Sequence, residues 1–178
     1  RVAALPYDVV NSEEAREMTA DNPFSFLHVD KAEIDLPKDI DIYSPEVYKK
    51  AKENLYGMIE KAILVQDDKP MLYIYELTMN GRSQTGIVGC ASIDEYLNGT
   101  IKKHELTRED KEQDRIRHVD ICNANTGPIF LAYRTEKRIS DIVEKIKKGL
   151  PVYDFIAEDG IKHRVWVIDK TEDINDIT

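Results

Sequence analysis

The sequence predicts an α+β protein in which a mixed, largely antiparallel sheet of hairpins is flanked by helices. Asn80-Gly81 separates two apolar segments, residues 71–77 and 87–91, and Asn-Gly between such segments is a strong short-range hairpin signal. Asp159-Gly160 is a second turn signal of the same kind. Because hairpins predominate over alternating strand and helix units, a doubly wound parallel sheet is not expected. The hairpin strands are expected at residues 71–77, 87–91, 152–157 and 161–168.

Two helices are predicted near the N-terminus. Asn11 followed by Glu14 has the form of a capping box, and the helix it starts should run to about Ala20. Ser44 as N-cap and Pro45 at the first helical position begin a longer helix with one apolar stripe, which should pack into the core. The stripe consists of residues at three- and four-residue steps: Val47, Ala51, Leu55, Met58, Ile59, Ala62 and Ile63.

The remaining elements follow from composition and capping residues. Strands are expected at residues 2–5, 24–29 and 129–133, the last of them buried, and an extended segment at 101–107. Short or charged helices are expected after Ser92, after Thr107 and over residues 140–148. The charged helix has only a thin apolar edge, and residues 171–178 contain no finished element.

Bulk composition excludes several classes of protein. The chain has 178 residues and a formal charge of −9, which opposes binding to nucleic acid. Its apolar runs fall far short of the ~20 residues needed to cross a bilayer. Cys90 and Cys122 lack zinc-ligand spacing and are expected to be buried free thiols in a reducing cytoplasm.

The ends of the sequence bear on its organisation. No secretory leader opens the chain, and its first residue is Arg rather than Met, which suggests a trimmed N-terminus. Residues 1–178 are expected to form a single domain or the N-terminal part of a longer protein. The oligomeric state does not follow from the sequence.

Reactive side chains are most concentrated around residues 102–107. Glu105 is a candidate general base, since a carboxylate can take a proton from a hydroxyl within hydrogen-bond reach. His104 precedes it and faces the opposite way if the segment is extended. Arg115 can grip a phosphate or a carboxylate with two donors. The alternatives are an exposed strand carboxylate for Glu105 and a solvated ion pair between Arg115 and Asp114.

A second set lies at the start of the chain. Tyr7 and Asp8 precede a helix whose first N–H groups, at residues 11–13, could bind a phosphate, although helix capping also explains Asn11. His28 and Asp30 would share one strand face, but two ligands do not make a metal site, so no metal site is predicted.

Four short motifs occur in an order and spacing that cover nearly the whole chain. They are Pro6-Tyr7-Asp8-Val9-Val10, Asn22-Pro23 with Phe26-Leu27-His28-Val29, Lys103-His104-Glu105-Leu106-Thr107 with Asp114-Arg115, and Pro128-Ile129-Phe130. On these motifs the sequence resembles the bacterial family known as domain of unknown function 1015. Members of that family carry a later Ala-Asp-Gly-His-His-Arg segment that this sequence lacks, so it resembles an N-terminal portion.

The resemblance implies distant kinship with ParB and sulfiredoxin-like nucleotide-binding proteins, which include kinases of free serine. By that analogy the protein is a nucleotide-dependent phosphotransferase that uses ATP or ADP with Mg²⁺ and acts on a small hydroxyl substrate. Glu105 would be the base, with His104, Thr107 and Arg115 as neighbours. Two alternatives stay open: a nucleotide-binding switch without turnover, and a protein-interaction domain.

Replacing Glu105 with Gln is expected to lower turnover by about 10²–10⁴-fold if the protein is an enzyme, because the amide keeps the shape of the side chain but cannot accept the proton. Product assays and ATP or ADP calorimetry on Glu105→Gln separate the three classes. An enzyme loses turnover in the variant. A switch has no turnover and keeps its nucleotide affinity, and an interaction domain is unchanged because it has neither property.

Overall fold

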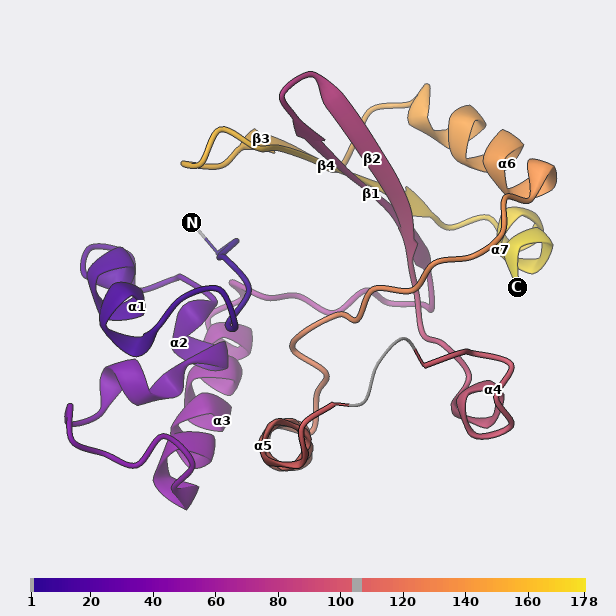
Figure 1. Ribbon diagram of the computed structural model, residues 1–178. Helices are drawn as coiled ribbons and strands as arrows, with labels where there is room; N and C mark the ends of the chain where they lie inside the picture. The colour runs from indigo at the N-terminus through magenta and orange to yellow at the C-terminus, as the bar shows by residue number, and fades with distance from the viewer. Residues whose placement is uncertain (1, 104–106) are drawn as a thin grey trace. The chain divides into compact units, whose positions relative to one another are not determined.

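The computed structural model describes residues 2–103 and 107–178, which confirm the predicted α+β class (Figure 1). The chain divides into two compact units. We call residues 1–66 with 104–131 the helical unit, and residues 67–103 with 132–178 the sheet unit.

The helical unit is built from short helices around one longer helix. Its elements are α1 (Ser12–Thr19), α2 (Leu27–Asp30), the 3₁₀ helix η1 (Ala32–Asp35), α3 (Pro45–Glu60) and α5 (Glu109–Cys122). The predicted capping box is confirmed, because Asn11 and Glu14 each bond the other's backbone N–H. The helix after Ser44 is confirmed as α3, although the Ser44 hydroxyl makes no cap hydrogen bond.

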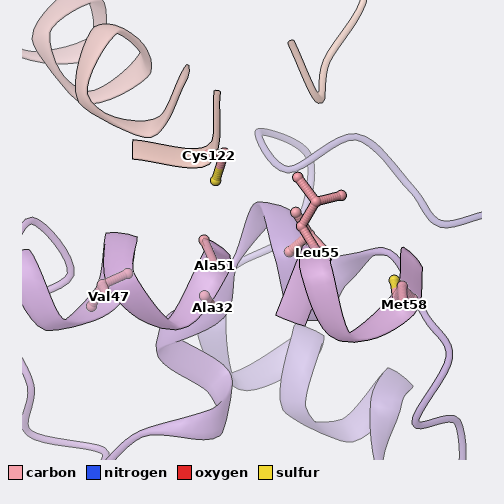
Figure 2. Close-up of a cluster of buried hydrophobic side chains, with 7 residues drawn as sticks. Ala32, Val47, Ala51, Leu55, Met58 and Cys122 are labelled. Carbon is pink, nitrogen blue, oxygen red and sulfur yellow. The ribbon is translucent and has the colours of Figure 1, made fainter. Parts of the chain in front are cut away.

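The core of the helical unit lies along α3. Ala51 of α3 and Ala32 of η1 are almost fully buried, and Cys122 of α5 lies against the same cluster (Figure 2). Small side chains at these positions let the helices approach closely. The predicted stripe therefore supplies the core with Val47, Ala51, Leu55 and Met58, whereas Ile59 is exposed.

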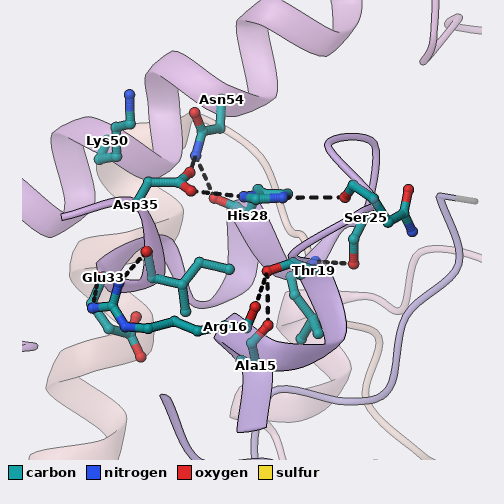
Figure 3. A network of polar contacts seen from close by, with 12 residues as sticks. Ala15, Arg16, Thr19, Ser25, His28, Glu33, Asp35, Lys50 and Asn54 are labelled. Carbon is teal, nitrogen blue, oxygen red and sulfur yellow. Dashed lines mark hydrogen bonds and ion pairs between the residues drawn. The ribbon is translucent and has the colours of Figure 1, made fainter. Parts of the chain in front are cut away.

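A polar network fastens the short helices to α3 (Figure 3). The Asn54 side chain donates to the His28 carbonyl at 2.6 Å and to the Asp35 carboxylate at 2.7 Å. His28 Nδ1 lies 2.9 Å from the same Asp35 carboxylate. The Arg16 guanidinium donates to the Glu33 and Ile34 carbonyls. Backbone groups that α2 and η1 leave unpaired thus find side-chain partners.

The sheet unit contains a four-stranded antiparallel sheet and three helices among the described residues. Its elements are β1 (Leu72–Met79), β2 (Arg82–Val88), α4 (Ile93–Leu97), α6 (Lys137–Lys147), β3 (Tyr153–Ile156), β4 (Lys162–Ile168) and α7 (Thr171–Ile177). The strand order is β2-β1-β4-β3, so the two hairpins meet along β1 and β4. The second strand of the first hairpin was expected at residues 87–91 but starts directly after the turn and ends at Val88. Asn80 and Gly81 have φ values of 50° and 77°, as a two-residue hairpin turn requires.

One face of the sheet is covered by α6 and α7 (Figure 1). Ile74, Trp166 and Ile168 pack there against Val143. Glu76, two residues after Ile74, points to the same face and is 2% exposed. Lys147 lies 2.7 Å from its carboxylate, and Arg164 contacts the other oxygen. Two cations thus compensate the buried charge.

Several predicted elements are wrong. Residues 2–5 form no strand, and residues 24–29 fold into the turn and helix of α2, where the Ser25 hydroxyl accepts the Leu27 N–H. Residues 129–133 are exposed and unpaired in the described sheet, because apolar composition alone does not supply a neighbouring strand. The N-cap of α5 is Arg108 rather than Thr107.

Two further expectations need correction. Residues 171–177, expected to contain no finished element, form α7, whose Ile174 and Ile177 pack against the covered sheet face. Cys122 is buried as expected, but Cys90 is exposed.

Replacing Ile74 with Ala is expected to lower the free energy of unfolding of the sheet unit by about 2–5 kcal/mol, because Ile74 is fully buried and the deletion leaves a cavity. Trp166 is the single tryptophan of the chain and lies in the same cluster, so its fluorescence during urea denaturation reports this unit. Ile156→Ala is the matched control, since Ile156 is 68% exposed. An equal effect of both changes would contradict the assigned core.

Candidate functional site

The helical unit contains a cavity of about 380 Å³, a size suited to a small molecule. Its walls come from the turn before α1, from α2, η1 and α3, and from α5. The lining includes four carboxylates and three cationic side chains, with tyrosine rings between them. We call this cavity the helical-unit pocket.

One face of α5 supplies much of the polar lining. Four residues of α5 share one helix face, because they are three positions apart on either side of one adjacent pair. All four line the helical-unit pocket: Lys111, Asp114, Arg115 and His118. Cys122, one turn further along α5, belongs to the buried core cluster and attaches the helix to it.

Arg115 lies between a ring and a carboxylate. Its guanidinium carbon is 4.2 Å from the centre of the Tyr7 ring, and two of its nitrogens donate to Asp114 at 3.0 and 3.2 Å. Stacking on Tyr7 holds the guanidinium plane, and the group has more donors than this carboxylate uses. An anionic ligand can therefore bind Arg115 without first breaking the pair with Asp114.

Asp114 is fixed from the other side by Tyr48. The buried Tyr48 hydroxyl donates to the second Asp114 oxygen at 2.8 Å. Burial and the neighbouring Asp114 raise the pKa of Tyr48 to about 12. This phenol is accordingly a hydrogen-bond donor at neutral pH, and it keeps Asp114 oriented toward Arg115.

The other two cations of the pocket have different partners. Lys31 lies 3.2 Å from Glu33, which also accepts a hydrogen bond from Ser12 at 2.6 Å. Lys111 donates to the Tyr43 hydroxyl at 3.1 Å, and this bond is the main cause of a raised pKa for Lys111. Lys111 therefore keeps its charge at neutral pH.

Asp30 and His118 lie at the end of the pocket formed by α2 and α5. The Thr126 hydroxyl donates to Asp30 at 2.6 Å, and burial raises the pKa of the Asp30 carboxyl despite that bond and the nearby Arg115. His118 Nε2 lies 3.0 Å from the Val29 carbonyl.

Three of the predicted site residues meet at this pocket. Tyr7, Asp8 and Arg115 all line it, although Arg115 lies more than 100 positions from the other two. Thr107 is exposed and does not line the pocket. His104 and Glu105 lie outside the described residues, so their roles stay predictions.

The predicted anion site at the start of α1 is not available in the form expected. Asn11 Oδ1 accepts from the Glu13 and Glu14 N–H groups at 2.9 Å, and the Asn11 N–H donates to Glu14. The capping box thus uses these donors, and two glutamates in the first turn repel an anion.

The predicted pairing of His28 with Asp30 on one strand face is wrong. These residues belong to α2, where positions two apart point in different directions. No cluster of three or more His, Cys, Asp or Glu side chains suited to a metal ion occurs within residues 2–103 and 107–178. Magnesium bound with a nucleotide needs one or two carboxylates plus phosphate oxygens, and Asp8 at the pocket is of the right chemical type.

The fold and the pocket define an α+β protein with a polar cavity in its helical unit. The family model described as Protein of unknown function (DUF1015) matches residues 1–178. The chain therefore belongs to this family, as the resemblance predicted. No curated protein and no solved structure matches the chain. Within the part of the chain that the structure describes, every helix is too short or too polar to span a membrane.

Sequence reasoning missed the contribution of α3 and the full polar face of α5. Tyr48, Lys111 and His118 were not among the predicted site residues. The spacing of residues 111, 114, 115 and 118 was the available signal, because it places four polar groups on one helix face. The contact between Tyr48 and Asp114 joins residues 66 positions apart, so no local pattern could indicate it.

Replacing Tyr48 with Phe is expected to lower the free energy of unfolding by about 1 kcal/mol at neutral pH, because Asp114 loses a hydrogen-bond donor. The pKa of Tyr48 is about 12 in the folded protein against an ordinary 10.0. The extra stability of the wild-type protein over Tyr48→Phe is therefore complete below pH 10 and declines toward pH 12. Urea denaturation of both proteins across this range measures the difference. A difference that grew with pH would contradict the assigned contact.

Proposed function

We propose that this protein is a nucleotide-dependent phosphotransferase that transfers a phosphoryl group from ATP to a small hydroxyl substrate such as free serine. The observation that supports it best is the meeting of Arg115, Tyr7 and Asp8 at one cavity of suitable size. The family resemblance had singled out these residues from separate motifs.

Arg115 is suited to hold the anionic group of the substrate. Its guanidinium is oriented by the Tyr7 ring and by Asp114, and a guanidinium so fixed binds a carboxylate or a phosphate with little loss of side-chain freedom. Lys111 lies one helical turn away on the same face and adds a second positive charge.

In the proposed reaction the substrate hydroxyl oxygen attacks the γ-phosphorus of ATP, and an oxygen–phosphorus bond forms as the bond to the β–γ bridging oxygen breaks. ADP leaves with that electron pair, and the hydroxyl proton passes to a carboxylate, for which Glu105 is the candidate. Mg²⁺ supplies neutralisation of the phosphate charge when it is bound. Arg115 fixes the acceptor for in-line attack.

Replacing Arg115 with Gln is expected to lower kcat/KM for free serine by about tenfold or more, since a hydrogen bond to a charged group is lost. The assay measures O-phosphoserine and ADP formed from L-serine and MgATP by the 178-residue chain. Arg138→Gln is the matched control, because Arg138 pairs with Asp176 in the sheet unit at 3.5 Å and the charge change is identical.

Two outcomes would overturn the proposed phosphotransferase activity. ATP binding by calorimetry without product would favour a nucleotide-binding switch. No binding of either ATP or L-serine by the folded chain would favour a protein-interaction domain.

A further inference from the structure

Asp30 is a partly buried carboxylate of the helical-unit pocket that forms no ion pair with a described residue. One of its oxygens accepts a hydrogen bond from the Thr126 hydroxyl at 2.6 Å. The other oxygen has no hydrogen-bond partner among the described residues, yet it is not one of the buried unpaired atoms, so it is accessible to solvent. Burial raises the pKa of this carboxyl even with Arg115 nearby. The charge of Asp30 is therefore not compensated by the chain itself.

The other carboxylates of the pocket are either paired or exposed. Asp114 lies 3.0 Å from the guanidinium of Arg115, and Glu33 lies 3.2 Å from a lysine. Asp8 is exposed, so water solvates its charge. Asp30 alone among these described residues of the pocket combines partial burial with the lack of an ion-pair partner. A bound cation would supply that partner.

Arg115 lies near Asp30 but forms its ion pair with another residue. The helices α2 and α5 are in contact where His118 Nε2 lies 3.0 Å from the Val29 carbonyl. Asp30 follows Val29 in α2, and Arg115 lies three positions before His118 in α5. Two of the Arg115 nitrogens donate to Asp114, whereas the third has no hydrogen-bond partner among the described residues. Unused guanidinium donors and an uncompensated carboxylate thus line the same cavity.

We propose that the Asp30 carboxylate binds the ammonium group of a zwitterionic α-amino acid whose own carboxylate is held by Arg115. The zwitterion brings the cation that Asp30 lacks and an anion for the unused donors of Arg115. This inference rests on the proposed function, because it concerns the same pocket, and it assigns the residue that distinguishes an amino acid from a hydroxy acid. Asp30 is a binding residue in this proposal and not the base of the reaction.

L-serine and 3-hydroxypropanoate test the proposal, because they differ only in the ammonium group. In calorimetry the wild-type 178-residue chain is expected to bind L-serine at least about tenfold more tightly, since a hydrogen bond between charged groups is lost with 3-hydroxypropanoate. Equal affinities for the two ligands overturn the inference but leave the proposed function. Failure of the wild-type chain to bind L-serine overturns both.

Asp30→Asn removes the charge, while the amide oxygen can still accept from Thr126. This variant is expected to lose most of the preference for L-serine and to keep its affinity for 3-hydroxypropanoate, which also shows that it is folded. Asp120→Asn is the matched control, because Asp120 is exposed on α5 and does not line the pocket. It is expected to keep the preference. A preference that Asp30→Asn retains overturns the inference but leaves the proposed function.

Carbon-13 NMR of the wild-type chain gives a readout that does not depend on any variant folding. Bound L-serine is expected to lower the pKa of the Asp30 carboxyl, because an adjacent ammonium group favours the charged form, and 3-hydroxypropanoate is not. Arg115, His118 and Cys122 of α5 lie close enough to interact electrostatically with this carboxyl, and all three are the same in both measurements. An unchanged pKa at saturating L-serine, or an equal fall with both ligands, overturns the inference but leaves the proposed function.

Discussion

The close packing of α3 against η1 and α5 is the constraint on which the helical unit depends. Ala51 and Ala32 have no side chain beyond Cβ, and both are almost fully buried in the cluster that Cys122 completes. Helix axes approach closely where side chains are this small. That approach brings Tyr48 within 2.8 Å of Asp114, so the geometry of the pocket follows from the size of residues in the core. A larger side chain at Ala51 would move the wall of the pocket as well as strain the core.

The pocket is polar, yet its charges largely compensate one another. Arg115 pairs with Asp114, and Lys31 pairs with Glu33. In a chain of net charge −9, long-range attraction does not draw an anion toward such a site. An anion that binds there would have to be held by short-range contacts at fixed positions, against the guanidinium donors that Asp114 leaves unused. This argues for a small molecule that matches the pocket group by group rather than for an extended anionic polymer.

The sequence correctly predicted those elements that depend on residues close together in the chain. The Asn80-Gly81 turn and the Asn11 capping box depend on residues at most three apart, and both are present. The strand predicted at residues 129–133 is absent from the described sheet, because a strand needs a neighbouring strand and composition does not identify one. Separate motifs named Tyr7, Asp8 and Arg115, which line one pocket, and their roles stay predictions. Their meeting, and the roles of Tyr48 and His118, depend on how α3, α2 and α5 pack and could not be read from spacing alone.

His118 shows how α5 is held against the rest of the helical unit. The helix has little apolar surface, with Cys122 as its contribution to the buried cluster, so polar bonds to other elements must help to hold it. One ring nitrogen of His118 provides such a bond, to Val29 of α2. An aliphatic side chain would fill the space but leave the Val29 carbonyl unpaired. A histidine at this position therefore helps to hold α5 against α2.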